Sequence, residues 1–119
     1  MKVCVPTRGS GGLDDHVSEH FGRAQTFTVV DRESGKVTVI ENKSDHMGGT
    51  GKPPEQIKSS GPSIVLCSGL GPNAIAMLRS YGMEVYLGAN GTAKEAVGQF
   101  ERGELRPATE ESACREHKH

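Results

Sequence analysis

Short apolar runs, separated by polar segments that are rich in glycine, set the pattern of this chain. The first three runs have the composition of strands, and the later ones alternate with segments that have helix signals. Thr92 followed by Glu95 has the spacing of a capping box at the start of the last helix. The predicted elements, in chain order, are strands at 3–6, 26–31 and 36–41, a helix at 53–60, a strand at 63–68, a helix at 73–81, a strand at 83–87 and a helix that begins after residue 92 and ends near residue 103.

The order of these elements, βββαβαβα, restricts the topology. Helices that connect consecutive strands make those strands parallel, whereas the short connection at residues 32–35 favours an antiparallel hairpin. We expect an α/β protein with a five-stranded mixed sheet in the spatial order 3-2-1-4-5 and about three helices, in three layers as in ribonuclease H-like folds. Residues 1–105 would form one domain, and the polar residues 106–119 would form a flexible tail.

Charge and composition exclude several classes of function. The 14 basic and 15 acidic residues give a net charge of −1, which favours neither nucleic acid nor an anionic membrane as a partner. No apolar run approaches the roughly 20 residues that span a bilayer. Three cysteines without a secretory signal argue against a disulfide scaffold, and we expect free thiols in a cytoplasmic protein.

In the predicted topology, four polar connections lie along the same edge of the sheet. The first, third, fourth and fifth strands all point toward this edge. Open α/β sheets bind ligands where connections diverge to either side, which here is the gap between the first and fourth strands. We therefore expect the binding site among the connections 7–25, 42–52, 68–72 and 88–91.

The first connection carries two histidines, His16 and His20, among acidic residues. On a helix, residues four apart share a face and could ligate one metal ion. Neutral imidazole suits iron, copper and zinc, and Gly22 would allow a close approach. The alternative is two solvated loop histidines, which the spacing alone favours.

The second connection contains His46, Gly48, Gly49 and Lys52. A lysine and the backbone N–H groups of a glycine segment could hold an anion. The segment lacks the spacing of a phosphate-binding P-loop, and Pro53 stands where Ser or Thr would be, so we exclude nucleotide hydrolysis. The alternative is a surface loop without a ligand.

Residues 69–73, Gly-Leu-Gly-Pro-Asn, lead from a strand into a helix. Exposed N–H groups at the start of a helix attract anions, so an anionic cluster would suit this position. The alternative is an ordinary strand-to-helix turn, which is the commoner case.

The cysteines differ in their expected roles. Cys67, at the end of a strand, could supply a thiolate at the edge of the site, whereas Cys4 is expected in the core. Near the C-terminus, Cys114, His117 and His119 lack a second ligand pair for a structural zinc site. We expect them to form a solvated tail with adventitious metal affinity.

Four motifs together resemble a known family. They are VSEHFGRA at 17–24, TFTVVD at 26–31, GLGPNA at 69–74 and VYLGANGT at 85–92. They resemble the dinitrogenase iron–molybdenum cofactor biosynthesis family, which includes NifX-like proteins and the C-terminal domain of NifB-like proteins. The resemblance extends over about residues 2–105. Cys67 departs from the small residue that the family often has at this position.

This resemblance implies a ribonuclease H-like fold and the non-catalytic carriage of a metal–sulfur cluster, related to nitrogen fixation. The cluster would be the iron–molybdenum cofactor, its iron–sulfur precursor or, as in orange-protein-type members, a molybdenum–copper sulfide. A cofactor-assembly or acceptor protein would receive it. The expected metal ligands are His20 and, in auxiliary roles, His46, Cys67 and His16. The other expected cluster contacts are Phe21, Gly22, Gly48, Gly49, Gly69, Gly71 and Asn73.

Two other classes of function remain open. A metal-free regulatory or protein-interaction module of the same fold would use the loops as a docking surface. A nuclease or other hydrolase would need several carboxylates around divalent metals, and the first strand, residues 3–6, contains none. We therefore expect a protein that is not an enzyme.

Overall fold

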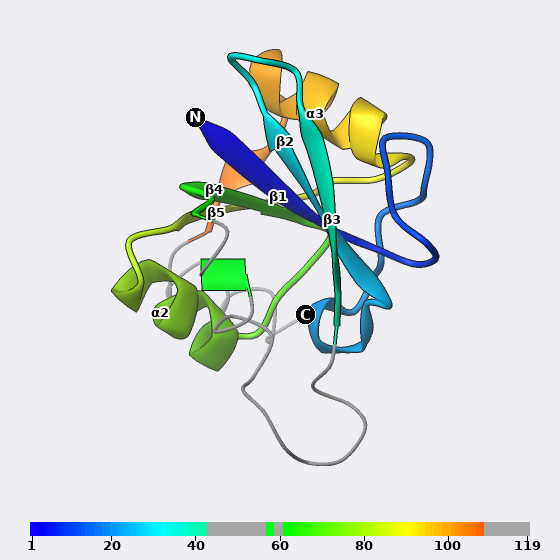
Figure 1. Ribbon diagram of the computed structural model, residues 1–119. Coiled ribbons are helices and arrows are strands. Elements are labelled where there is room, and N and C mark those ends of the chain that lie inside the picture. Colours follow the sequence, from blue (N-terminus) through cyan, green and yellow to red (C-terminus); the bar gives the residue numbers. More distant parts are fainter. Residues whose placement is uncertain (43–56, 59–60, 109–119) are drawn as a thin grey trace.

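The computed structural model describes residues 1–42, 57–58 and 61–108, and these form a mixed α/β fold around a six-stranded sheet (Figure 1). The strand order is β3-β2-β1-β4-β5-β6. The strands are β1 (Lys2–Thr7), β2 (Thr26–Asp31), β3 (Val37–Glu41), β4 (Ile64–Cys67), β5 (Glu84–Leu87) and β6 (Arg106–Pro107).

The predicted order of the first five strands is confirmed. β2 pairs antiparallel with both β1 and β3, whereas β4 lies parallel to both β1 and β5. The carboxyl-terminal ends of β1, β3, β4 and β5 therefore share one edge, which we call the carboxyl edge. At this edge the chain leaves β1 toward β2 and leaves β4 toward β5, in opposite directions along the sheet.

The sixth strand corrects the prediction of five. β6 pairs antiparallel with β5, and the amide of Ala108 donates to the carbonyl of Val85 at 2.7 Å. Hydropathy did not indicate this strand because both of its residues are exposed. Residues 106–108, which we assigned to a tail, thus pair with the sheet, and residues 109–119 lie outside the described part of the chain.

The described residues contain two α-helices, α2 (Pro72–Ser80) and α3 (Ala93–Glu101), and one 3₁₀ turn, η1 (Phe21–Arg23). Of the helix that we expected at 53–60, only residues 57 and 58 are described, and both are helical. No helix in the described residues is long and apolar enough to cross a bilayer.

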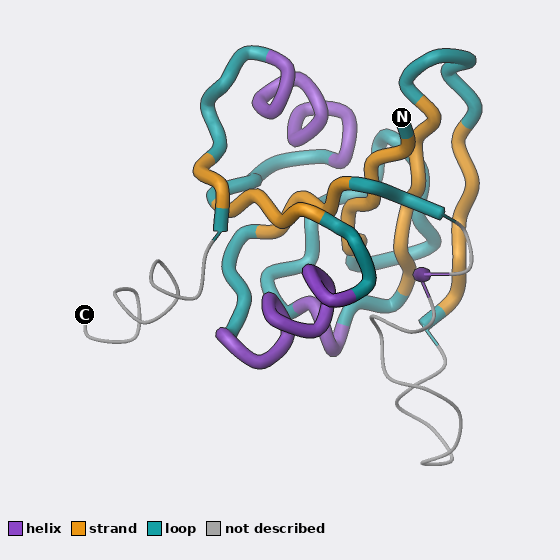
Figure 2. Tube along the Cα trace, turned by 90° about the vertical axis from the view of Figure 1, so that its left-hand side faces the viewer, coloured by secondary structure: helices purple, strands orange, loops and turns teal. Residues whose placement is uncertain are grey.

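The two helices cover opposite faces of the sheet (Figure 2). The face under α2 and η1 carries the larger apolar cluster, in which side chains of every strand from β1 to β5 meet Phe21 and the buried face of α2. The face under α3 carries a second cluster. Central members of the first cluster are Cys4, Phe27, Val65, Cys67, Ile75 and Leu78, and those of the second are Val3, Val5, Leu66, Ala93 and Ala96.

Candidate functional site

The loop that follows β1 is fixed at the carboxyl edge by backbone hydrogen bonds. The amide of Ser18 donates to the carbonyl of Pro6 at 2.8 Å, and that of Val17 donates to Gly91 at 2.8 Å. The side chain of Val17 is buried in the cluster under α3. The loop is therefore attached both to its own strand and to the connection after β5.

Asp15 gives this loop its shape. Its carboxylate accepts hydrogen bonds from the amides of Gly9, Gly11 and His16, each at 2.8 Å. Partial burial acts to raise the pKa of Asp15, but these three backbone donors outweigh it and hold the pKa below its ordinary value. This carboxylate, one of the acidic residues around the two histidines, is thus used inside the loop.

The same loop closes the N-terminus of α3. The hydroxyl of Thr92 accepts from the amide of Glu95 at 3.1 Å, and the carboxylate of Glu95 accepts from the amide of Thr92 at 2.9 Å, which confirms the predicted capping box. The two amides between them, of Ala93 and Lys94, donate to the carbonyls of Asp15 and Leu13. This helix terminus therefore has protein partners for its first-turn N–H groups.

His16 lies beside α3. Its backbone pairs with Thr92. The pKa of Glu95 lies below its ordinary value chiefly because its carboxylate accepts hydrogen bonds from Thr92, and the nearby His16 adds a smaller effect there and at Asp15. The segment from His16 to His20 is not helical, so the two histidines do not share a helical face. The condition under which both would ligate one metal from a shared helical face is therefore not met.

His20 lies at the start of η1, on the face of α2, and its side chain is exposed. The next residue, Phe21, is 4% exposed, and its ring centroid lies 5.2 Å from that of Phe27 in the core. Phe21 therefore anchors this corner rather than presenting a surface to a ligand. No described residue forms a hydrogen bond or ion pair with the imidazole of His20.

The start of α2 lies on the same face of the sheet as η1, and we take it as the other side of the candidate site (Figure 1). Gly71 is its N-cap residue and provides no side-chain cap, and Pro72 at the first helical position has no N–H. The next two amides, of Asn73 and Ala74, have no partner among the described residues. Leu70, just before the helix, packs against the same cluster as Phe21, so both segments are anchored in one core.

At three positions in these two segments, neither the backbone conformation nor the described neighbours require a glycine. Gly22, Gly69 and Gly71 have no positive φ, and a Cβ at each would meet nothing within 4 Å among the described residues. Elsewhere the described glycines have a positive φ, as at Gly11 and Gly91, or a close neighbour, as at Gly9. Backbone without side chains therefore faces open space on both sides of the candidate site.

Cys67 does not reach this space. Its side chain is 1% exposed, and burial raises the pKa of its thiol to about 12. Cys4 is fully buried, as we expected, and burial raises its pKa as well, with Cys67 adding a smaller effect. In this conformation Cys67 is a core residue because its strand is buried over its whole length. We leave it out of the site.

Several predicted residues lie outside the described part of the chain: His46, Gly48, Gly49, Cys114, His117 and His119. Within residues 1–42, 57–58 and 61–108, no group of three or more His, Cys, Asp or Glu side chains could hold a metal ion. A metal ligand drawn from the described residues would thus act with donors of another kind.

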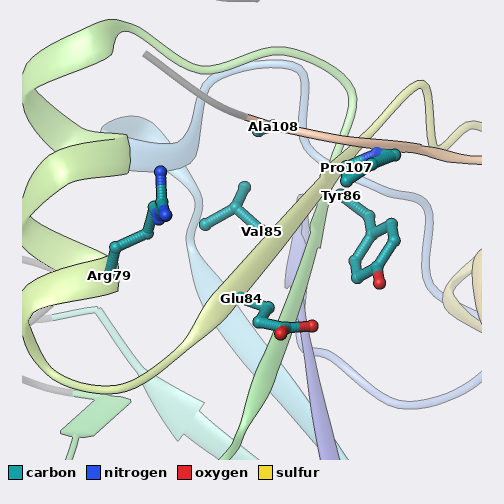
Figure 3. Close-up of a pocket in the computed structure, with 6 residues that line it drawn as sticks. All are labelled: Arg79, Glu84, Val85, Tyr86, Pro107 and Ala108. Atoms are coloured by element: carbon teal, nitrogen blue, oxygen red, sulfur yellow. The ribbon is translucent and has the colours of Figure 1, made fainter.

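A pocket of about 190 Å³ lies at the opposite edge of the sheet (Figure 3). Arg79, in the last turn of α2, and Glu84, the first residue of β5, line it together with Tyr86. The side chain of Val85 points toward Arg79, whereas the ring of Tyr86 points away from it, and Ala108 completes the lining (Figure 3). None of the predicted site residues lines this pocket, so we do not connect it with the candidate site.

Two residues that hold the corner at His20 were missed by the sequence analysis. Ser18 bonds the backbone of His20, and Asn42 bonds carbonyls of η1. A serine two residues before the histidine has the spacing of a side-chain turn, which could have indicated its role. The contact of Asn42 joins segments about 20 residues apart, and no local pattern predicts it.

Comparisons with known proteins identify the family of this chain. The chain matches the family described as "Dinitrogenase iron-molybdenum cofactor" over residues 1–103. An uncharacterized protein from Methanocaldococcus jannaschii is 27% identical over 110 residues, which cover 88% of this chain and 89% of that protein.

Two solved structures share the fold. The NMR structure of a NifB-like protein from Thermotoga is 36% identical, with a TM-score of 0.76, covering 89% of this chain and 91% of that one. The apo form of the orange protein from Desulfovibrio gigas is 27% identical, with a TM-score of 0.80, covering 91% of this chain and 92% of that one. Since the family match spans most of the 119 residues, this chain belongs to the dinitrogenase iron–molybdenum cofactor family.

Proposed function

We propose that this protein binds a metal–sulfur cluster at the carboxyl edge and carries it without catalysing a reaction. The cluster is the iron–molybdenum cofactor, its iron–sulfur precursor or a related molybdenum–copper sulfide, and an assembly or acceptor protein receives it. Family membership supports this cargo class. The likeness to the apo form of the orange protein supports a removable ligand on this fold.

One observation carries the proposal: an exposed imidazole and the open start of a helix are both flanked by glycines that the fold does not require. A glycine that has neither a positive φ nor a close neighbour leaves its backbone open to a ligand. Gly22 follows the corner of His20, and Gly69 and Gly71 precede α2. This pairing favours a bulky ligand that touches backbone on two sides.

The donors fit the chemistry of such a ligand. Neutral imidazole is a suitable ligand for iron and copper, so His20 would contact the metal. The amides of Asn73 and Ala74 would donate to bridging sulfides, and the positive end of the α2 dipole would favour an anionic cluster. His46 remains an additional proposed ligand from the connection between β3 and β4.

Non-catalytic carriage requires release as well as binding. A site of few ligands at a surface edge holds its cargo less tightly than a closed set of four ligands would. The described residues supply one candidate imidazole and backbone donors, in keeping with a carrier that hands its cluster to a partner.

Anaerobic reconstitution tests the proposal. The protein is mixed with iron–sulfide or molybdenum–copper–sulfide species and desalted, and the retained cluster is measured by visible absorption and elemental analysis. We expect wild type to retain a chromophore and His20→Ala to lose most of it. His16→Ala is the matched control, because His16 lies beside α3, and it should retain the chromophore.

Two results would contradict the proposal. Equal retention by His20→Ala and wild type would remove His20 from the site. Background metal content in wild type after anaerobic purification and reconstitution would favour the metal-free alternative, in which the edge loops dock a protein.

A further inference from the structure

Ser18 holds His20 from the N-terminal side. Its side chain is buried, and its hydroxyl donates to the carbonyl of His20 at 3.1 Å and accepts from the amide of His20 at 3.3 Å. The backbone of Ser18 is itself bonded to Pro6 at the end of β1. Ser18 therefore links the backbone of His20 to the central strand β1 through hydrogen bonds.

Asn42 holds the same corner from the C-terminal side. Its side-chain amide donates to the carbonyl of Gly22 at 3.2 Å and to that of Ala24 at 2.8 Å, and its backbone amide donates to Gln25 at 3.0 Å. Asn42 comes directly after β3. η1 is thus fixed to the sheet by a residue that begins the connection to β4.

The backbone of His20 is fixed, whereas its side chain has no hydrogen-bond partner among the residues that the structure describes. Its amide bonds to Ser18, and its carbonyl accepts from both Ser18 and the amide of Arg23, at 3.1 and 3.0 Å. The imidazole is exposed. A residue that served only the packing of this corner would not need an exposed side chain on so constrained a backbone.

We propose that Ser18 and Asn42 are positioning residues that hold His20 in a pre-formed orientation for its ligand. The ligand-binding part of this inference rests on the proposed function, because it requires His20 to contact the cluster. Groups that orient a metal ligand typically change metal affinity by about 10- to 100-fold when they are removed. Here they act on the backbone of the ligand residue rather than on its ring.

The first experiment uses the apo protein and does not depend on the cluster. Amide hydrogen exchange at His20 and Arg23 is measured by NMR in wild type, Ser18→Ala, Ser18→Thr, Asn42→Ala and Ser80→Ala. Ser80 is the matched control, since its hydroxyl also donates to a backbone carbonyl, that of Met77 in α2. We expect exchange about 10-fold faster in Ser18→Ala and Asn42→Ala, and close to wild type in Ser18→Thr and Ser80→Ala.

The second experiment measures how long each reconstituted variant retains its chromophore in the presence of a chelator. Ser18→Ala and Asn42→Ala should take up the same metal per chain as wild type but lose it about 10-fold faster. Ser18→Thr, which keeps the hydroxyl, should restore retention, and Ser80→Ala should not change it. Should Ser18→Ala fail to fold, Asn42→Ala and Ser18→Thr carry the test.

The outcomes separate this inference from the proposed function. If His20→Ala loses the cluster while Ser18→Ala and Asn42→Ala retain it as wild type does, the positioning role is wrong and the proposed function stands. If His20→Ala retains the cluster, both fail. Unchanged amide exchange at His20 and Arg23 in both Ser18→Ala and Asn42→Ala would also overturn the positioning role, regardless of how long these variants retain the cluster.

Discussion

The N-termini of α2 and α3 both follow strands that end at the carboxyl edge, yet they are completed in different ways. α3 begins with a capping box, and its first two amides donate hydrogen bonds to carbonyls of the loop after β1. α2 begins with Gly71 and Pro72, and its next two amides have no partner among the described residues. One helix terminus is closed by the protein, and the other is open.

This difference assigns stability to one helix terminus, and the proposed function assigns binding to the other. A helix whose first-turn amides are unpaired lacks a stabilising contribution, since an N-cap side chain typically adds about 1 kcal/mol to the free energy of unfolding. At α3 the capping side chain makes this contribution, and carbonyls of the loop from Gly9 to Val17 accept further hydrogen bonds from the first turn. At α2 no described residue makes such a contribution, and in the proposed function these first-turn N–H groups bind the anionic cluster.

The largest effect is expected where the loop closes α3. Asp15→Ala removes the acceptor of three backbone amides, and the loop that caps α3 should lose its shape. We expect the free energy of unfolding to fall by about 2 kcal/mol. Urea unfolding followed by circular dichroism measures it. Asp14→Ala, at the exposed neighbouring carboxylate, should change stability by less than about 0.5 kcal/mol, and equal losses would contradict the role of Asp15.

The contribution of Asp15 should also depend on pH. Its pKa in the folded protein lies below the ordinary value of 3.8, so its stabilisation is fully present above that value and is lost as the pH falls through the lower, folded value. Between pH 7 and pH 3, the gap in unfolding free energy between wild type and Asp15→Asn should therefore stay constant down to about the ordinary value of 3.8 and narrow below it. A constant gap across this range would show that ionised Asp15 does not hold the loop.

A smaller effect is expected when the two helix termini are compared directly. Thr92→Ala removes the capping hydroxyl of α3 and should lower the free energy of unfolding by about 1 kcal/mol. Asn73→Ala, in the exposed first turn of α2, removes no hydrogen bond to described residues and should change it by less than about 0.5 kcal/mol. Chemical denaturation of both variants gives the comparison, and a loss at Asn73 as large as that at Thr92 would mean that α2 is closed as well.

The closed terminus could be predicted from sequence, because a capping box is local. The spacing of Thr92 and Glu95 is enough to indicate it. The directions of the first five strands followed from the kinds of connection between them, and their spatial order was expected from ribonuclease H-like folds. β6 was missed because Arg106 and Pro107 are exposed and make their pairing to a strand about 20 residues away.

The candidate site was harder to predict because its residues depend on distant contacts. The spacing of His16 and His20 says nothing of Gly91, whose carbonyl holds the loop between them. Cys67 ends its strand, as expected, but it points into the core under α2, where burial keeps its thiol protonated. The glycines were recognised as a group, and only the structure distinguishes Gly71 from those that a positive φ requires.

The smallest change in the free energy of unfolding is expected for a substitution at Gly71, which also tests whether the start of α2 binds the cluster. Gly71 has an N-cap conformation, with φ −73° and ψ 161°, that any residue can adopt, and a Cβ there meets no described atom within 4 Å. Gly71→Asp would close α2 as Thr92 closes α3, and because glycine is only slightly poorer than Asp at an N-cap, we expect a gain of about 0.3 kcal/mol.

The same substitution should reduce retention of an anionic cluster, because the carboxylate would occupy the amides of Asn73 and Ala74 and repel the ligand. Thr92→Asp is the matched control, since it adds the same charge at the terminus that is already closed, and it should leave retention unchanged. Gly71→Ser adds a capping hydroxyl without charge and should fall between wild type and Gly71→Asp. If all three variants retain the cluster as wild type does, the open terminus of α2 takes no part in binding, and the contrast between the two helices concerns stability alone.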